Sequence, residues 1–222
     1  MDYVGGARVP GEGGTLSLHK RGEDFTLMVH DVELMSSGAH ESEDALASLA
    51  CAKLAHASAP VVLIGGLGMG YTLAAALKGV GPGARVIVSE LIPQVVEWNR
   101  GPLSHLAGHP LRDPRVAVRV QDVAMSLQTE AAAFDAILLD VDNGPEGLTR
   151  DSNNWLYSPD GLTSAYTALR PNGVLAVWSS TPERTFAMRL RKLGFEVEEV
   201  RVASSTRAQD DRHTIWLAVN RG

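Results

Sequence analysis

The chain of 222 residues carries 20 basic and 26 acidic side chains, and its net charge of −6 excludes the basic surface typical of nucleic-acid-binding proteins. No apolar run approaches the roughly 20 residues that cross a bilayer, and the first residues lack the charged-then-apolar pattern of a signal peptide. We therefore expect a cytoplasmic protein without nucleic-acid or membrane partners. The lone cysteine, Cys51, lies in an Ala/Leu-rich stretch and is predicted to be a core residue rather than a nucleophile.

The first 58 residues are predicted to form a small N-terminal unit. Residues 1–14 are rich in glycine and are expected to be loose. Residues 15–35 predict a β-hairpin of two strands with the segment RGED as the turn, because strand-like apolar patterns lie on both sides of it. A helix is expected over residues 41–57, where acidic residues near the start suit the positive end of the helix dipole.

Residues 59–222 alternate strand-like and helix-like segments and are predicted to form one α/β domain. The first strands are almost wholly apolar, which is typical of a parallel sheet buried on both faces. The last two strands are joined without a helix, which indicates an antiparallel strand at the end of the sheet. The prediction is a doubly wound, mostly parallel sheet of seven strands. The predicted strands cover 61–65, 85–90, 115–122, 134–142, 173–179, 195–202 and 213–220, and the predicted helices cover 71–79, 93–100, 161–170 and 182–194.

A glycine-rich turn follows the first strand of this domain, in the stretch VVLIGGLGMGYTL. Ligands of doubly wound sheets lie outside the carboxyl ends of the strands, and missing side chains let backbone N–H groups approach a ligand. A tight turn without a ligand is the alternative. Tyr71 stands where the last glycine of a G-x-G-x-x-G motif would be, which disfavours a nicotinamide or flavin ligand. The candidate ligand-binding glycines are Gly65, Gly66, Gly68 and Gly70.

Acidic residues end the second and third strands of the predicted sheet. Glu90 is placed to accept hydrogen bonds from ribose hydroxyls, and Asp122 is placed to meet an adenine edge. Each of them could instead cap the helix that follows. Together with the glycines they mark three successive strand ends, which predicts a nucleoside site. Because the chain has no Walker-type lysine, we expect S-adenosylmethionine, whose cationic sulfonium suits an acidic cleft.

With these segments in order, the sequence resembles the spermidine synthase family, the aminopropyltransferases that share the class I methyltransferase fold. The similarity covers about residues 25–219 and rests on VLIGGLGMGYTL, VIVSELIPQVVEWNR, VRVQDVAMSL and the long segment that begins FDAILLDVDNGPEGL. It implies a Rossmann-like fold, Glu90 as the ribose ligand, Asp122 near the adenine, and a homodimer formed through the N-terminal strands.

Three positions depart from the pattern of that family. Gly68 stands where the resemblance places an Asp that helps to hold the amine tail of decarboxylated S-adenosylmethionine. The Asp-x-x-Asp after the fourth strand is shortened to Asp140-Val141-Asp142. Of the N-terminal polar residues that help to bind the polyamine, only His40-Glu41 remains clearly. The fold and the nucleoside site therefore transfer from the resemblance, whereas the diamine site and the choice of donor do not.

The carboxylates after the fourth strand are the candidate catalytic groups. Displacement at a carbon beside a sulfonium depends mostly on positioning, but an amine acceptor is protonated at neutral pH and must lose a proton. Asp140 is the first choice for the group that takes or steers this proton, and Asp142 is the second. Capping of the following loop is the alternative role for either carboxylate.

The acceptor site is predicted to include a loop of about 15 residues that begins at Asn143 and ends near Tyr157. Loops of this length without regular structure are commonly functional, and we interpret this one as a lid that excludes water. Trp155 and Tyr157 either line the acceptor pocket or pin the lid to the body of the domain. Trp178, at the end of the fifth strand, packs either beside the acceptor or in the core.

These patterns predict a transferase that moves an alkyl group from an S-adenosylmethionine-type donor to a small nucleophilic acceptor, expected to be an amine. Methyl transfer is preferred, because Gly68 and the missing N-terminal polar residues weaken the polyamine interpretation. Aminopropyl transfer from decarboxylated S-adenosylmethionine, a non-catalytic nucleoside-binding module and a nicotinamide oxidoreductase are the alternatives. No metal site is predicted, since His105 and His109 lack further ligands at a suitable spacing.

Overall fold

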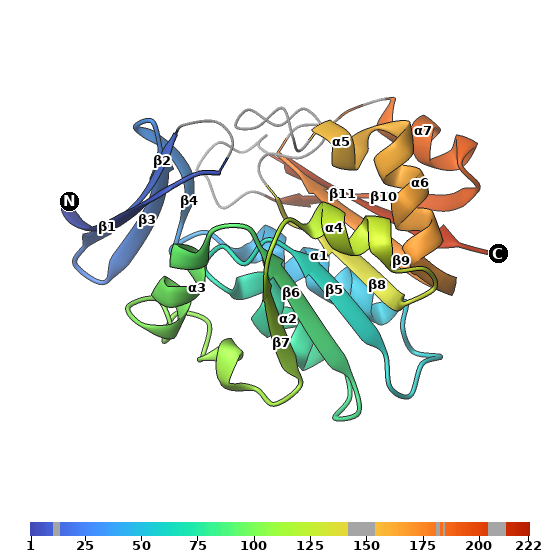
Figure 1. The fold of residues 1–222 in the computed structure, drawn as a ribbon, viewed down its shortest axis with the longest axis horizontal. Helices are drawn as coiled ribbons and strands as arrows, with labels where there is room; N and C mark the ends of the chain where they lie inside the picture. Colours follow the sequence, from blue (N-terminus) through green and yellow to red (C-terminus); the bar gives the residue numbers. More distant parts are fainter. Residues whose placement is uncertain (11–13, 142–153, 181–182, 184, 204–211) are drawn as a thin grey trace.

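The computed structural model describes residues 1–10, 14–141, 154–180, 183, 185–203 and 212–222. Two sheets organise the molecule, with the four-stranded N-terminal sheet at one end and the C-terminus at the other (Figure 1). The larger sheet comprises β5 (Val61–Gly65), β6 (Arg85–Glu90), β7 (Val116–Val120), β8 (Phe134–Leu139), β9 (Leu169–Ser179), β10 (Phe195–Ala203) and β11 (Arg212–Asn220). The helices are α1 (Glu41–Ala52), α2 (Tyr71–Gly79), α3 (Pro93–Arg100), α4 (Val123–Thr129), α5 (Asn154–Tyr157), α6 (Pro159–Ala168) and α7 (Phe186–Lys192), with a short 3₁₀ turn at Pro110–Arg112.

The seven-stranded sheet has the order β10-β11-β9-β8-β5-β6-β7, which confirms the predicted doubly wound α/β fold. The chain leaves β5 in one direction to β6 and β7 and then returns on the other side through β8 and β9. The strand order therefore reverses between β5 and β8, the place where such sheets bind ligands. The predicted antiparallel strand is β11, but it lies between β9 and β10 rather than at the edge. Its inner position suits a strand whose residues are buried on both faces, while the more polar β10 takes the exposed edge.

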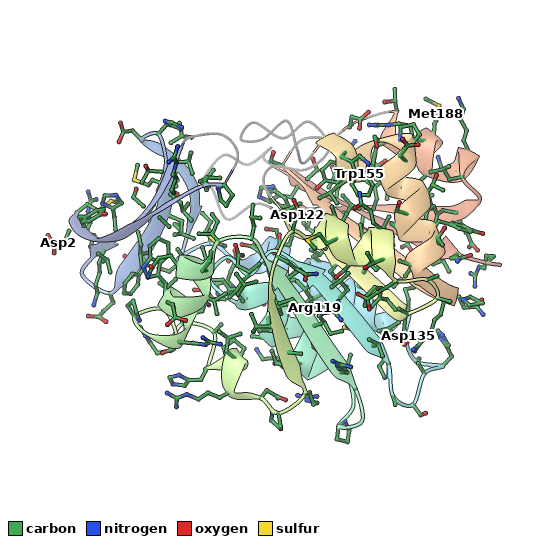
Figure 2. All side chains as sticks on the ribbon, viewed as in Figure 1. Asp2, Arg119, Asp122, Asp135, Trp155 and Met188 are labelled. Carbon is green, nitrogen blue, oxygen red and sulfur yellow. The ribbon has the colours of Figure 1, made fainter. Side chains whose placement is uncertain are left out.

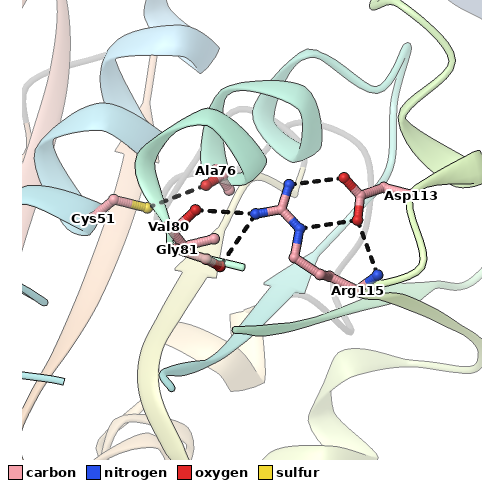
Figure 3. Close-up of polar contacts among 6 residues, drawn as sticks. All are labelled: Cys51, Ala76, Val80, Gly81, Asp113 and Arg115. Carbon is pink, nitrogen blue, oxygen red and sulfur yellow. Dashed lines mark hydrogen bonds and ion pairs between the residues drawn. The ribbon is translucent and has the colours of Figure 1, made fainter. Parts of the chain in front are cut away.

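Alternate residues of the parallel strands bury opposite faces of the sheet. Ile64 and Val88 belong to a cluster that includes residues of α1, α2 and α3, whereas Leu63 and Ile87 belong to a cluster with α4, α6 and α7. Cys51 lies in the first cluster, where its thiol contacts the carbonyl oxygen of Ala76 at 3.8 Å (Figure 3). Burial raises the pKa of this thiol to about 11. Cys51 is thus a core residue, as predicted.

The N-terminal sheet is larger than the predicted hairpin and contains β1 (Asp2–Arg8), β2 (Thr15–Arg21), β3 (Asp24–Val29) and β4 (Val32–Ser36). The prediction that residues 1–14 are loose was wrong for residues 2–8, because β1 pairs with β2 along its backbone, and residues 11–13 lie outside the described residues. Gly5 allows this strand to pass close to α3, since a Cβ there would lie 3.2 Å from the indole nitrogen of Trp98. The segment predicted as one strand reverses at His30-Asp31, where both residues take positive φ angles of 48° and 65°.

The remaining predicted elements are confirmed, with shifted ends. Helix α1 ends at Ala52 rather than near residue 57, and α4 is a short helix that the sequence analysis did not predict. No helix in the described part of the chain is long and apolar enough to span a membrane. The division of the chain at residue 58 stays a prediction.

The side chain of Arg115 joins two segments at the amino-terminal ends of the strands. Arg115 donates from Nε and Nη2 to the two carboxylate oxygens of Asp113, at 2.9 and 2.7 Å (Figure 3). Its Nη1 donates to the carbonyl oxygens of Val80 and Gly81, at 3.0 and 3.3 Å. The hydrogen bonds from Arg115 lower the pKa of Asp113 from 3.8 to about 2. Arg115 thereby ties the chain after α2 to the start of β7.

We expect Arg115→Ala to destabilise the fold by about 1–2 kcal/mol, or by about 3–6 °C in the midpoint of thermal unfolding, because several charge-assisted hydrogen bonds are lost. Arg85→Ala is the control, since Arg85 is exposed and the described residues give its side chain no partner. The folded-state pKa of Asp113 lies below its ordinary value, so the stabilisation is present above about pH 4 and is lost as the pH falls toward 2. Equal effects of the two substitutions at pH 7 would contradict this role.

Candidate active site

The glycine-rich turn after β5 requires backbone φ angles that residues other than glycine adopt only under strain. Gly66, Gly68 and Gly70 have φ angles of +89°, +52° and +87°. A Cβ on Gly66 would lie only 2.5 Å from the carbonyl oxygen of Asp140, so a side chain cannot fit between β5 and the end of β8. The backbone is thus bare at the point where the strand order reverses.

Two other elements fix the far side of this turn. Asn99 on α3 donates from its amide to the carbonyl oxygens of Gly68 at 2.8 Å and Val95 at 2.9 Å. A Cβ on Gly68 would lie 3.0 Å from the sulfur of Met35, which belongs to β4. The thioether of Met35 therefore occupies the space toward which a side chain at position 68 would grow, where the family resemblance implies a carboxylate.

Glu90 lies buried at the end of β6, with 7 % of its surface exposed. Its Oε2 accepts the N–H of Leu67 and its Oε1 accepts the N–H of Ile92, both at 2.8 Å. Backbone donors hold a negative charge in place, so Glu90 connects the glycine turn to the end of β6 and fixes an anionic group there. Its contact with a ribose stays a prediction.

Asp122 follows β7, and Figure 2 shows it at the opposite end of the sheet from Asp135. Its Oδ1 accepts the N–H of Ala124 at 2.9 Å, so the side chain caps α4. The preceding residue, Gln121, donates its N–H to the carbonyl oxygen of Glu90 at 3.0 Å, which places Asp122 beside the end of β6. The capping role that the sequence left open is therefore present, and the contact with adenine stays a prediction.

Asp140 comes directly after β8 and is tied to the glycine turn. Its N–H donates to the carbonyl oxygen of Gly65 at 3.0 Å, and its Oδ2 accepts the hydroxyl of Thr72 on α2. Burial, and to a smaller extent the negative charge of Glu43, raise the pKa of Asp140 from 3.8 to about 7, although the bond from Thr72 opposes the shift. This carboxyl group can therefore gain or lose a proton near neutral pH.

The first turn of α1 lies against the first turn of α2. The ring of His40 stacks on that of Tyr71, with centroids 4.1 Å apart and planes 13° apart, and the Tyr71 hydroxyl donates to the carbonyl oxygen of Ser37 at 3.0 Å. Thr72 follows Tyr71 and holds Asp140, so α1 is placed beside the same carboxylate. Glu43 and Thr72 thus belong to the candidate site, a role that the sequence did not predict for them. The sequence could have indicated Glu43, because this acidic residue stands where the spacing of apolar residues along the helix favours an apolar side chain.

The predicted aromatic residues lie on opposite faces of the sheet. Leu139 of β8 pairs with Val177 of β9, so Trp178 is the next residue along β9, beside Asp140. Its indole contacts the ring of His213, with centroids 4.9 Å apart, and its buried Nε1 has no hydrogen-bond partner among the described residues. Trp178 therefore stands next to the candidate catalytic carboxylate.

Tyr157 and Trp155 pack on the other face of the sheet, where α5, α6 and α7 lie (Figure 2). Tyr157 is 2 % exposed and its ring meets that of Phe186 edge-on, with centroids 5.9 Å apart. Its hydroxyl lies 3.5 Å from the carbonyl oxygen of Val141, directly after Asp140. Asp142, Asn143 and most of the predicted lid lie outside the described residues.

The described residues fit an S-adenosylmethionine-type group. Gly66 and Gly68 carry no side chain and are only half-buried, so the backbone of the turn is accessible where the strand order reverses. Glu90 places a fixed negative charge at the next strand end, and Asp122 offers its second carboxylate oxygen one strand further along. A ligand with hydroxyls and a cationic centre matches this set of donors and acceptors better than a phosphate does.

We expect Gly66→Ala to destabilise the fold by more than about 2 kcal/mol and to remove nucleoside binding, because a Cβ adds both backbone strain and a clash with Asp140. Gly81→Ala is the matched control, since a Cβ there meets nothing within 4 Å and the backbone is not left-handed. Thermal unfolding and calorimetric titration with S-adenosylmethionine measure the two effects. Normal stability and binding in Gly66→Ala would show that the close approach is not required.

Comparison with known proteins agrees with this geometry. The model of the spermine/spermidine synthase domain matches residues 47–190, which is more than half of the chain. A search of curated proteins gives no match.

Three solved structures are similar over nearly the whole chain. Spermidine synthase from Thermotoga maritima aligns with a TM-score of 0.79 and 18% identity, over 100% of this chain and 73% of that one. A spermidine synthase in complex with the transition state analogue AdoDATO aligns with a TM-score of 0.76 and 17% identity, over 100% and 73% of the two chains. A probable spermidine synthase from Corynebacterium glutamicum aligns with a TM-score of 0.67 and 19% identity, over 99% and 80%. These similarities support the fold, and the domain match shows that the chain belongs to the spermine/spermidine synthase family and is a transferase of the S-adenosylmethionine type.

Proposed function

We propose that this protein is an aminopropyltransferase, which moves the aminopropyl group of decarboxylated S-adenosylmethionine to a small amine. The observation that carries the proposal is Asp140, a carboxyl group with a pKa of about 7 at the strand-order reversal of a chain in the spermine/spermidine synthase family. A similar structure was solved with the transition state analogue AdoDATO, which also supports it. Methyl transfer, which the sequence favoured, has no support from the similar proteins and becomes the second candidate.

The donor would be held by the bare backbone of the glycine turn, with Glu90 beside the ribose and Asp122 beside the adenine. When bound, the donor supplies an electrophilic carbon next to a sulfonium, whose sulfur leaves with the bonding electron pair as a neutral thioether. The rigid links from Glu90 to the glycine turn and from Gly65 to Asp140 keep the acidic groups at fixed positions around it. Positioning of this kind supplies most of the rate in an in-line displacement.

Asp140 acts on the acceptor. An alkyl ammonium has an ordinary pKa of about 10 and cannot attack until it loses a proton. Burial raises the pKa of Asp140, which makes it a stronger base than an exposed carboxylate, and the same burial favours the neutral amine. Asp140 takes one proton, the nitrogen–carbon bond forms and the carbon–sulfur bond breaks, so that one proton is released overall.

The second candidate is methyl transfer from intact S-adenosylmethionine, and the position of Met35 favours it. Met35 lies against Gly68, so the described structure provides no carboxylate there for the amine tail of the decarboxylated donor. We further propose that Asp142 assists Asp140 and that Asn143, Trp155, Tyr157 and Trp178 contribute to the acceptor site. The homodimer and the cytoplasmic location stay predictions.

The identity of the nucleoside product distinguishes the two reactions. The purified chain would be incubated with decarboxylated or intact S-adenosylmethionine and a set of aliphatic amines. Aminopropyl transfer yields methylthioadenosine from the decarboxylated donor, and we expect this product. S-adenosylhomocysteine formed from the intact donor would instead establish methyl transfer. Asp140→Asn should lower kcat/KM by about 100-fold or more, whereas Asp24→Asn, at an exposed position of β3, should leave it unchanged.

The pH dependence should report the titration of Asp140. Because the carboxylate form accepts the proton, kcat/KM should rise with pH through about 7. The pH at which it rises should stay the same for amines of different pKa, because it reports Asp140 and not the amine. The folded-state pKa lies above the ordinary value of 3.8, so this group stabilises the fold at low pH and the stabilisation is lost as the pH rises through 7. Asp140→Asn should therefore gain thermal stability relative to the parent between pH 5 and pH 8. A parent profile that is flat between pH 6 and 8 would contradict the role of Asp140.

A further inference from the structure

Glu43 occupies a position on α1 where helix packing favours an apolar residue. Leu46, Ala47 and Ala50 lie on the buried face of this helix, and Glu43 precedes the first two by three and four residues. Only 9 % of its surface is exposed. Since burial of a carboxyl group is costly unless it is compensated, its presence on this face calls for a functional partner or a structural one.

Hydrogen bonds and the nearby ring of His40, rather than an ion pair with Lys or Arg, oppose the cost of burying Glu43 among the described residues. Its Oε2 accepts the hydroxyl of Ser42 at 2.5 Å, and no Lys or Arg in the described ranges forms an ion pair with it. The titratable groups that face it are His40 and Asp44 on α1, Tyr71 on α2 and Asp140 after β8. The charge of His40 lowers the pKa of Glu43, but His40 is also bonded to Asp44 at 2.9 Å, and no Lys or Arg in the described ranges pairs with either Glu43 or Asp140.

The packing of the two helices directs Glu43 toward Asp140. The stacked rings of His40 and Tyr71 fix the first turn of α1 on the first turn of α2, where Thr72 donates to Asp140. Burial raises the pKa of Glu43, and its charge raises the pKa of Asp140. Two carboxyl groups that interact in this way titrate as a pair, and a pair that keeps one proton still carries one negative charge near neutral pH.

A side chain of β9 next to Asp140 also has a polar atom without a partner among the described residues. The Nε1 of Trp178 is buried, stands beside Asp140 and has no hydrogen-bond partner among the described residues. Orphaned buried N–H groups are uncommon in native structures, because they cost free energy unless water or a ligand supplies an acceptor. Asp140 thus has a second carboxyl group near it on α1 and, on the neighbouring strand, an indole that can donate a hydrogen bond to a ligand.

We propose that Glu43 is a second acceptor-binding residue, which together with Asp140 holds the ammonium group of an aliphatic amine beside Trp178. The inference rests on the proposed function, in which the acceptor is an amine. Glu43 lies in the first turn of α1, whose start is fixed on α2 by the stacked rings of His40 and Tyr71. A lone ammonium compensates the single charge that the pair retains.

The two carboxylates take different parts in the reaction. The acceptor ammonium gives one proton to Asp140, and its nitrogen then forms the new bond to carbon as the carbon–sulfur bond breaks. The product nitrogen is again a cation, with two carbon substituents and two hydrogens. Glu43 stays ionised and paired with nitrogen before and after transfer, so its removal should weaken acceptor binding more than turnover.

Calorimetric titration with 1,4-diaminobutane, with and without saturating methylthioadenosine, tests the proposal on the full chain. Glu43→Gln should bind the diamine at least tenfold more weakly, and the KM for the amine should rise at least tenfold while kcat changes less. Donor affinity should stay within twofold of the parent. Glu97→Gln, an exposed position on α3, should leave all of these values unchanged. Glu43→Gln should also move the pH limb of kcat/KM below 7, because Asp140 loses the neighbouring charge.

Glu43→Met keeps the test decisive if the Gln variant does not fold. A thioether side chain suits the apolar face of α1, so this variant should be at least as stable as the parent and should lose diamine binding equally. Parent-like diamine binding and KM in a folded Glu43 variant would overturn the inference and leave the proposed function intact. If the parent transfers no group to any amine, the proposed function fails. Diamine binding that depends on Glu43 would then still support the inference, and absent or Glu43-independent binding would overturn it.

Discussion

The close approach of Gly66 to the carbonyl oxygen of Asp140 is the constraint on which the site depends. Gly66 donates its N–H to Ser89 at 2.9 Å, and Asp140 donates its N–H to Gly65 at 3.0 Å, so the ends of β6, β5 and β8 are bonded in a row. Any side chain at position 66 would force β5 and β8 apart. The positions of Glu90 and Asp140 relative to the glycine turn follow from these few backbone contacts, because each acidic residue comes directly at the end of one of the bonded strands.

The protonation behaviour of the site depends on a second layer of packing, in which α1 lies on α2. Burial is the main cause of the raised pKa of Asp140, and the charge of Glu43 adds to it. Both effects oppose stability at neutral pH, since each carboxyl group would be ionised at lower cost in water. The two apolar clusters on the faces of the sheet stabilise the fold and offset the cost of burying these carboxyl groups.

The sequence predicted the elements that form because of their own residue pattern. It did not predict the elements that form because of contacts with distant parts of the chain. The strands from β5 to β11 have strong apolar runs, and their bounds differ from the prediction by at most four residues, the number by which β9 begins earlier. The sequence of strand β1 shows no alternation of apolar and polar residues. The strand forms because its backbone pairs with β2 and because Gly5 fits against Trp98. The reversal at His30-Asp31 contains no glycine or proline. The sequence shows that Glu43 lies on the apolar face of a helix. It does not show that Asp140 is nearby, because the packing of α1 on α2 brings the two together.

The acidic residues at the strand ends look equivalent in sequence, and their surroundings make them different. Glu90 accepts two backbone N–H groups, which stabilise its negative charge and fix its orientation. Asp140 accepts one hydroxyl and faces a second carboxyl group, so its charged form is disfavoured and it exchanges a proton near neutral pH. A fixed anion suits a residue that holds a ligand through the whole reaction, whereas a titrating carboxyl group suits a residue that must accept a proton and release it again. In the proposed mechanism, the different roles of Glu90 and Asp140 therefore arise from backbone donors at one strand end and from their scarcity at the other.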